Sequence, residues 1–353
     1  SNTLDSTNFK FTNLRKGKYL MIALKEATSD YIFNPKSDKI GFYKDTILLP
    51  RDSVIEKPIV IFYEQQPYKF KRGKEVSKGK IVFGYEGKIE DFKINIQSKV
   101  PKDFKSISKF VVDKDSLNYW FTPFETDSLN FIVSNANFLD TITVKLRKKK
   151  IDSLTISSSI SNTFHFRDTL FLKTNNPIIK IDSTKISVFN KDTIAVPFSS
   201  YIDKKENKIA VLFSKKQEQK YKVTFLPEAF KDIFEQKNDT LKYNFKTLEL
   251  EDYGRITINI VNPNSSALII ELLEGNNKKK VVERRFISKS EKLVFDLLQP
   301  KTYFIRAIVD NNKNNTWDTG NYLLKQLPER IIYYEEELTI RANLYIENTF
   351  VVK

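Results

Sequence analysis

Short stretches in which apolar and polar residues alternate recur along the whole chain. A period of two is typical of strands that bury one face, and these stretches are rich in β-branched and aromatic residues. Turns of Asp, Asn, Ser and Lys separate them at intervals of roughly 8–14 residues, a spacing typical of β-sandwiches. The sequence therefore predicts an all-β protein of tandem β-sandwich domains. The expected strands include Tyr19–Leu24, Lys80–Tyr85, Phe92–Gln97, Ser116–Phe121, Ser128–Val133, Thr141–Leu146, Ile209–Phe213, Tyr221–Phe225, Ile256–Val261, Leu268–Leu273, Leu293–Leu297 and Tyr303–Val309.

One short helix is expected at Pro227–Phe234, after the strand Tyr221–Phe225. Helical periodicity is scarce elsewhere in the chain. At 353 residues, of which 40% are hydrophobic, the chain is long enough and apolar enough for several packed cores. We divide it into four domains: residues 1–66, 67–150, 151–249 and 250–353.

The composition excludes most recognisable catalytic chemistry. The chain has no Cys, which excludes disulfides, cysteine zinc sites, iron–sulfur clusters and thiol catalysis. Its single His, His165, excludes histidine triads and sites with several histidine ligands. Only 9 Gly are present, and no phosphate-binding glycine loop occurs. We therefore predict no catalytic residue and no cofactor, and what remains is a binding, scaffolding or structural protein or a carboxylate-only enzyme.

The chain is basic, with 59 Lys and Arg against 44 Asp and Glu and a formal net charge of +15. Only 11 of the basic residues are Arg, the side chain that favours bidentate recognition of phosphates and guanines. A nucleic-acid partner is therefore not expected. The dense runs Lys69–Lys74 and Arg147–Lys150 are interpreted as solvated turns or sheet edges, where lysine prevents edge-to-edge pairing.

Two segments 284 residues apart match without gaps, which indicates two copies of one module. In the second copy, the strands Ile256–Val261 and Leu268–Leu273 precede the matched part, and the first copy has no counterpart to them. We expect either that the full protein extends upstream of Ser1 or that a separate piece supplies these strands. The matched pairs are Phe9 with Leu293, Phe11 with Phe295, Leu14 with Leu298, Tyr19 with Tyr303, Ala23 with Ala307, and Phe33 with Trp317.

One loop in the second copy places oxygen-bearing side chains at alternate positions: Asp310, Asn312, Asn314, Thr316 and Asp318. Alternate Asp and Asn residues begin calcium loops, because hard Ca²⁺ prefers six to eight oxygen ligands. The sixth position is Asn315 rather than Gly, and the twelfth is Asn321 rather than Glu. These departures favour a hairpin whose Asn and Asp side chains bond to one another, and a calcium site at the same five residues is the alternative.

Two stretches resemble known domain families. The order Lys220-Tyr221-Lys222-Val223-Thr224, Ala229-Phe230-Lys231-Asp232 and Tyr243-Asn244-Phe245-Lys246-Thr247 resembles the Ig-like domain of bacterial surface-layer proteins. The end modules, through Phe295–Tyr303 and Asp310–Gly320, resemble transthyretin-like or carboxypeptidase-regulatory-like β-sandwiches. Together they are similar to Ig-like-domain outer-membrane lipoproteins of Bacteroidota. Recurring Asp-Ser/Thr-apolar tripeptides, such as Asp168-Thr169-Leu170, look like O-glycan acceptor motifs of that group. Turn chemistry is the favoured reason for the pattern, and the two interpretations are compatible.

The resemblance implies export, a cell-envelope location and an upstream lipid anchor that these residues do not include. It implies no catalytic activity. We therefore expect a non-catalytic structural or interaction protein that binds a protein partner through sandwich surfaces or strand edges. A carbohydrate-binding accessory module and an unrecognised carboxylate-dependent hydrolase stay open as alternatives. The first requires exposed aromatic side chains, and the second requires two carboxylates about 5–10 Å apart in a cleft.

Overall fold

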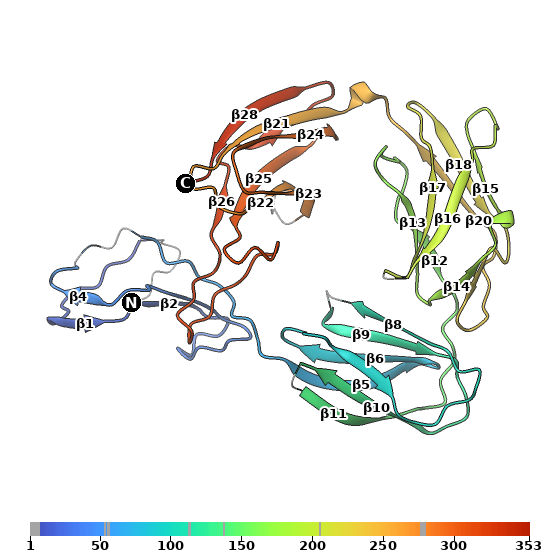
Figure 1. The fold of residues 1–353 in the computed structure, drawn as a ribbon, viewed down its shortest axis with the longest axis horizontal. Coiled ribbons are helices and arrows are strands. Elements are labelled where there is room, and N and C mark those ends of the chain that lie inside the picture. The colour runs from blue at the N-terminus through green and yellow to red at the C-terminus, as the bar shows by residue number, and fades with distance from the viewer. Residues whose placement is uncertain are drawn as a thin grey trace. The chain divides into compact units, whose positions relative to one another are not determined.

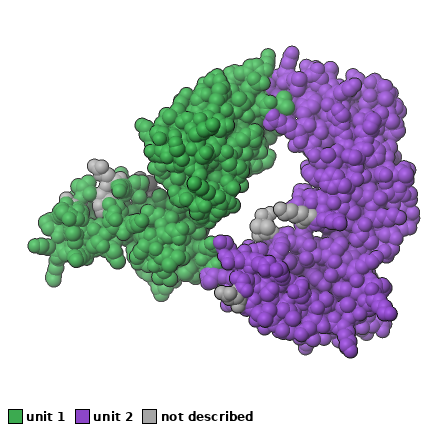
Figure 2. Space-filling view, in the orientation of Figure 1, with its two compact units in different colours: residues 1–66, 254–353 green, residues 67–253 purple. Residues whose placement is uncertain are grey.

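The computed structural model describes residues 8–52, 54, 57–111, 114–136, 138–204, 206–275 and 280–353. Segments in which apolar and polar side chains alternate form β-strands along its whole length. The all-β prediction is confirmed, and the sheets pack as tandem β-sandwiches (Figure 1). Contacts divide the chain into two compact units, one of residues 1–66 with 254–353 and one of residues 67–253 (Figure 2). The boundaries of the four domains stay a prediction. In the described ranges, no helix has the length and apolarity needed to cross a lipid bilayer.

The second unit begins with a sandwich of two antiparallel sheets, ordered β5-β6-β9-β8 and β11-β10-β7. Its core is aromatic: Phe83 contacts both Tyr119 and Phe131, with ring centroids 6.2 and 5.1 Å away. Buried side chains occupy alternate positions along β6 and β10, as predicted. The strands are β5 (Lys69–Ser77), β6 (Lys80–Glu86), β7 (Lys93–Ile96), β8 (Ser106–Val111), β9 (Ser116–Phe121), β10 (Ser128–Asn135) and β11 (Phe138–Lys145).

In a second sandwich of this unit, the sheet β12-β13-β17-β16 packs against the sheet β15-β18-β20. Strands β14 and β19 form a separate two-stranded sheet. Leu172, Val211 and Val223 are among the side chains that fill its core. The elements are β12 (Ile156–Ser158), β13 (Leu170–Thr174), β14 (Ile178–Ile181), the 3₁₀ helix η2 (Ser183–Lys185), β15 (Ile186–Phe189), β16 (Phe198–Asp203), β17 (Lys208–Phe213), β18 (Lys220–Phe225), β19 (Phe230–Asp232), β20 (Leu241–Lys246) and the 3₁₀ helix η3 (Leu250–Asp252).

The prediction of a helix at Pro227–Phe234 is wrong, because this segment contains a turn followed by the short strand β19. Glu228 has a φ of 67°, which no α-helix allows. Asn238 accepts a hydrogen bond from the backbone N–H of Phe230, and Asp232 accepts from those of Phe234 and Gln236. These side-chain bonds replace the hydrogen bonds that a helix would have made.

In the first unit, residues 254–353 form a sandwich of the sheets β24-β21-β28 and β23-β22-β25-β26, with β27 paired to β25. Strand β28 runs parallel to β21, and the other ladders are antiparallel. Ile258, Ile270 and Ile305 lie fully buried between the sheets. The strands are β21 (Gly254–Val261), β22 (Leu268–Glu274), β23 (Lys280–Ile287), β24 (Glu291–Leu298), β25 (Thr302–Val309), β26 (Ile331–Tyr333), β27 (Leu338–Thr339) and β28 (Tyr345–Val351).

The N-terminal part of the same unit contains two short ladders, β1-β4 and β2-β3. The strands are β1 (Gly17–Tyr19), β2 (Ile22–Lys25), β3 (Lys39–Phe42) and β4 (Ile47–Leu49). Its buried cluster is small: Ile40, Phe42 and Phe62, with Phe33 and the distant Tyr322 packed against them. The rings of Phe42 and Tyr322 meet edge to face at 5.5 Å. Residues far apart in the sequence therefore share this core.

The ladder registers repeat between the two copies that the sequence match predicted. Tyr19 pairs with Ile47 as its counterpart Tyr303 pairs with Leu338. Ala23 pairs with Gly41 as Ala307 pairs with Ile332. Both copies also fix the turn before the tyrosine in the same way, because Tyr19 Oη donates to the carbonyl of Arg15 at 2.7 Å and Tyr303 Oη to that of Gln299 at 3.0 Å. The repeat is therefore a structural one.

Candidate functional site

The five residues of the predicted calcium loop lie together after β25. The carboxylate of Asp310 accepts hydrogen bonds from the backbone N–H groups of Asn314 and Asn315, at 3.1 and 2.8 Å. The carboxylate of Asp318 accepts from the side-chain amides of Asn312 and Asn314, at 2.6 and 2.7 Å. Thr316 Oγ1 donates to Asn314 Oδ1 at 2.7 Å. The oxygens therefore already bond to donors of the loop itself, and calcium binding stays a prediction.

Glu329, which the sequence analysis did not single out, holds this loop closed. Its carboxylate accepts hydrogen bonds from the backbone N–H groups of Asn311 and Asp318, at 2.7 and 3.0 Å. Its backbone carbonyl accepts a hydrogen bond from the indole N–H of Trp317 at 3.0 Å. Trp317 therefore has a local structural role in the loop.

Asp38 holds the equivalent loop of the first copy closed in the same way. It is fully buried, and it accepts hydrogen bonds from the backbone N–H groups of Ala27 and Asn34, at 3.0 and 2.7 Å. The bond from Ala27, followed by that from Asn34, lowers the pKa of Asp38 below its usual value. Ala27 and Asn34 match Asn311 and Asp318 in the repeat, so the two carboxylates occupy equivalent places.

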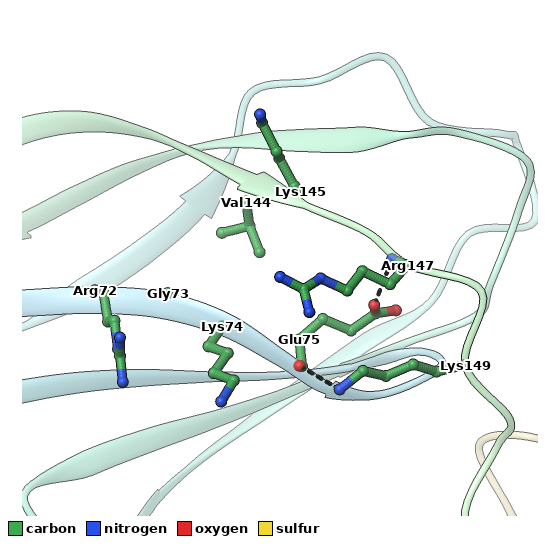
Figure 3. A pocket seen from close by; sticks show the side chains of 8 residues that line it. All are labelled: Arg72, Gly73, Lys74, Glu75, Val144, Lys145, Arg147 and Lys149. Carbon is green, nitrogen blue, oxygen red and sulfur yellow. Dashed lines mark hydrogen bonds between the residues drawn. The ribbon is translucent and has the colours of Figure 1, made fainter.

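A basic cavity of about 360 Å³ lies where β5 meets β11 and the segment after it (Figure 3). It is lined by residues of the two runs that the sequence analysis treated separately, Lys69–Lys74 and Arg147–Lys150. In Figure 3 the side chain of Arg147 extends toward Val144, beside Gly73. The lining residues are Arg72, Gly73, Lys74, Glu75, Val144, Lys145, Arg147 and Lys149.

Glu75 attaches the second basic run to β5. Its carboxylate, which is nearly buried, accepts a hydrogen bond from the backbone N–H of Arg147 at 2.7 Å. Lys149 Nζ donates to the backbone carbonyls of Glu75 and Val76, at 2.9 and 3.0 Å. These bonds leave the guanidinium of Arg147 available for another partner.

Gly73 permits the close approach of the two strands at the cavity. A Cβ at this position would lie 2.7 Å from atoms of both Phe83 and Val144. The cavity carries one acidic side chain against five basic ones. Among the described residues, no carboxylate lies within ion-pair distance of the side chains of Arg72, Lys74, Lys145 or Arg147. The cavity can therefore attract an anionic group of a partner.

A second, wider groove of about 840 Å³ crosses the sheet β15-β18-β20. Its aromatic side chains include Tyr221 and Phe245, which are buried in the sandwich core rather than exposed for stacking. Its lining lysines are Lys191, Lys220, Lys222, Lys242 and Lys246. The groove is therefore a second basic surface, but it lacks the enclosure of the first.

No protein family matches the chain, and no characterised protein matches it by sequence. Similar solved structures include domains 5–6 of the S-layer protein SbsC, 8% identical, with a TM-score of 0.23 over 53% of this chain and 99% of that one. The major pilin subunit BcpA of Bacillus cereus is 12% identical, with a TM-score of 0.21 over 77% and 84%. The I9–I11 tandem of titin is 8% identical, with a TM-score of 0.16 over 81% and 100%.

Proposed function

We propose that this chain is a non-catalytic structural and interaction protein of a cell envelope, and that it holds a protein partner through the basic cavity between β5 and β11. The observation that carries this proposal is the convergence of two basic runs on one cavity with a single, internally bonded carboxylate. The complementary partner surface is an acidic segment, because opposite charges across an interface steer association and fix its register.

The cell-envelope location rests on the resemblance of the sequence to Ig-like-domain outer-membrane lipoproteins. Tandem sandwiches suit a structural role in the cell envelope, because each domain packs its own core and extends the protein without a catalytic centre. Anchoring through a lipidated cysteine outside these residues is part of the same proposal. Fractionation of native cells, followed by protease treatment of intact cells, tests the location. Recovery of the protein with cytoplasmic proteins would contradict it.

Amine-reactive cross-linking of native envelopes, read by mass spectrometry, tests the binding site. The lysines are spread along the whole chain, so each surface reports with similar sensitivity. We expect cross-links to one partner to concentrate at Lys74, Lys145 and Lys149, and to disappear in the variant Arg147→Glu. A matched reversal in the second groove, Lys222→Glu, should leave them unchanged. Cross-links spread evenly over the chain, or equally affected by both variants, would exclude the cavity as the binding site.

A further inference from the structure

The two copies of the repeated module differ in how many strands cover them. In the second copy, β25 lies between β26 and β22. Strand β22 pairs with β25 along its whole length, from Leu268 opposite Val309 to Glu274 opposite Tyr303. In the first copy, the equivalent strands β1 and β2 pair only with β4 and β3 among the described residues. The edge of Tyr19–Lys25 that corresponds to the β22 side of β25 therefore has no strand on it in the described part of the chain.

The backbone of this edge is oriented to accept a strand. The N–H of Tyr43 donates to the carbonyl of Met21 at 2.9 Å, so Met21 directs its carbonyl toward the β3 side. Because backbone groups alternate along a strand, the N–H and carbonyl groups of Leu20, Ile22 and Leu24 point to the opposite, open edge. These are the groups that antiparallel pairing requires.

The first copy exposes apolar side chains whose counterparts in the second copy belong to its core. Phe11 is 48% exposed, whereas its counterpart Phe295 is fully buried by the strands around it. Phe9 and Leu14 are exposed in the same way, and their counterparts Leu293 and Leu298 are buried. Leu20, Ile22 and Leu24 add a second apolar strip, 42–62% exposed, on the alternate positions. Large apolar side chains exposed at neighbouring positions of a strand are typical of an interaction site.

Another open edge in the chain is protected. Strand β5 carries Lys69, Lys71 and Lys74 and has two register irregularities. Lysines and bulges are the common means by which proteins prevent added strands at an edge. Leu20, Ile22 and Leu24 provide no such protection, so the Tyr19–Lys25 edge is suited to pairing.

We propose that the Tyr19–Lys25 edge is a strand-acceptor site, which binds a seven-residue extended segment of a separate polypeptide in the antiparallel register that β22 adopts on β25. The segment is aliphatic on both faces, because Met21 and Ala23 lie on one face of the acceptor and Ile22 on the other. The end of the segment near Tyr19 carries an acidic residue, because Lys16 and Lys18 lie there. In the second copy, Lys301 bonds to Glu274 of β22 in a similar way, at 2.7 Å.

A second copy of this chain is a poor source of the segment. Its strands of the required chemistry, β21 and β22, are engaged in its own core, where Ile258, Ile270 and Leu272 are fully buried. Releasing them would expose that core to water, which costs more than the new ladder returns. The site therefore favours an extended segment that is not already part of a folded core.

The test uses a labelled synthetic peptide with the sequence of residues 266–275, which contains β22, added to the full chain. Fluorescence anisotropy measures its affinity, and hydrogen exchange locates it. We expect saturable binding that slows amide exchange at Leu20, Ile22 and Leu24. The same peptide with Ile270→Pro, and a scrambled peptide, should bind at least ~10-fold more weakly, because proline removes a donor from the ladder.

The protein variant Ile22→Pro gives the complementary measurement. It removes an N–H at the open edge only, so continued protection of the Tyr43 amide shows that β2 and β3 remain paired. We expect at least ~10-fold weaker binding of the unmodified peptide. The control Leu139→Lys changes an exposed leucine on β11 and should bind normally. Absent or non-saturable binding, protection elsewhere, or a chain dimer that Ile22→Pro dissociates would overturn the proposal.

Discussion

Asp38 and Glu329 show how single carboxylates determine loop conformation in this protein. Each accepts two backbone N–H groups from the loop that precedes it, at matching positions of the repeat. Neither residue could be identified from the sequence, because the two differ in type and the loops differ in length. The signal that could have found them is an acidic residue just before the strand that follows the loop, β3 in the first copy and β26 in the second. Buried backbone N–H groups need acceptors, and the carboxylate supplies two at once.

We predict that Asp38→Asn destabilises the loop of residues 27–38, because an amide supplies one acceptor oxygen in place of two. The folded-state pKa of Asp38 is lowered, so its stabilisation is complete above about pH 4, the ordinary aspartate value. It is lost as pH falls through the lower folded-state pKa. Hydrogen exchange at Ala27 and Asn34, measured across this range, tests the prediction. The variant should exchange faster at neutral pH, whereas Asp45→Asn, in an exposed turn, should not. Unchanged protection in Asp38→Asn would contradict it.

At the scale of elements, three adjacent strands of one sheet carry a charge cluster around a buried carboxylate. Glu271 of β22 is 1% exposed and accepts hydrogen bonds from Arg284 of β23 and Arg306 of β25. Burial lowers the pKa of Arg306, but bonds to Tyr333 and Glu271 outweigh it, so that the pKa is raised overall. The cluster therefore links three adjacent strands through one carboxylate. In the first copy, Ile22 replaces Arg306, which explains why its strand presents an apolar strip instead.

We predict that Glu271→Ala lowers the free energy of unfolding by about 3 kcal/mol, because it leaves two arginines without their buried partner. Urea denaturation of the chain, followed by tryptophan fluorescence and circular dichroism, measures this change. Glu347→Ala removes an exposed pair with Lys292 and serves as the control, with a much smaller expected effect. A loss in Glu271→Ala no greater than that of the control would show that the cluster is not important for stability.

At the scale of the whole molecule, the two units differ in how their cores are assembled. Residues 67–253 contain two complete hydrophobic clusters that use no residue from outside this range. In the described part of the N-terminal 66 residues, the hydrophobic cluster has three buried side chains, and Tyr322 from the other end of the chain packs against them. Thr319 Oγ1 donates to the carbonyl of Tyr63 at 2.6 Å, which adds a polar link within the same unit.

We predict that a fragment of residues 67–253 folds by itself, whereas a fragment of residues 1–66 does not. The first buries enough apolar surface for an independent domain, and the second buries too little. Nuclear magnetic resonance spectra of the two fragments test this difference through the dispersion of their amide signals. Adding residues 254–353 to the short fragment should restore dispersion. A well-dispersed spectrum of residues 1–66 alone would refute the prediction.

The sequence by itself determined the strands, the repeat and the class of fold, because alternation and turn chemistry depend on residues that are neighbours in the chain. It failed at Pro227–Phe234, where hydrogen bonds to the side chain of Asn238 produce a strand. Only the tertiary structure brought Lys69–Lys74 and Arg147–Lys150 to one cavity, and only it left the Tyr19–Lys25 edge open. Both depend on which distant strands pair, and pairing is decided by the whole set of buried contacts rather than by any local pattern.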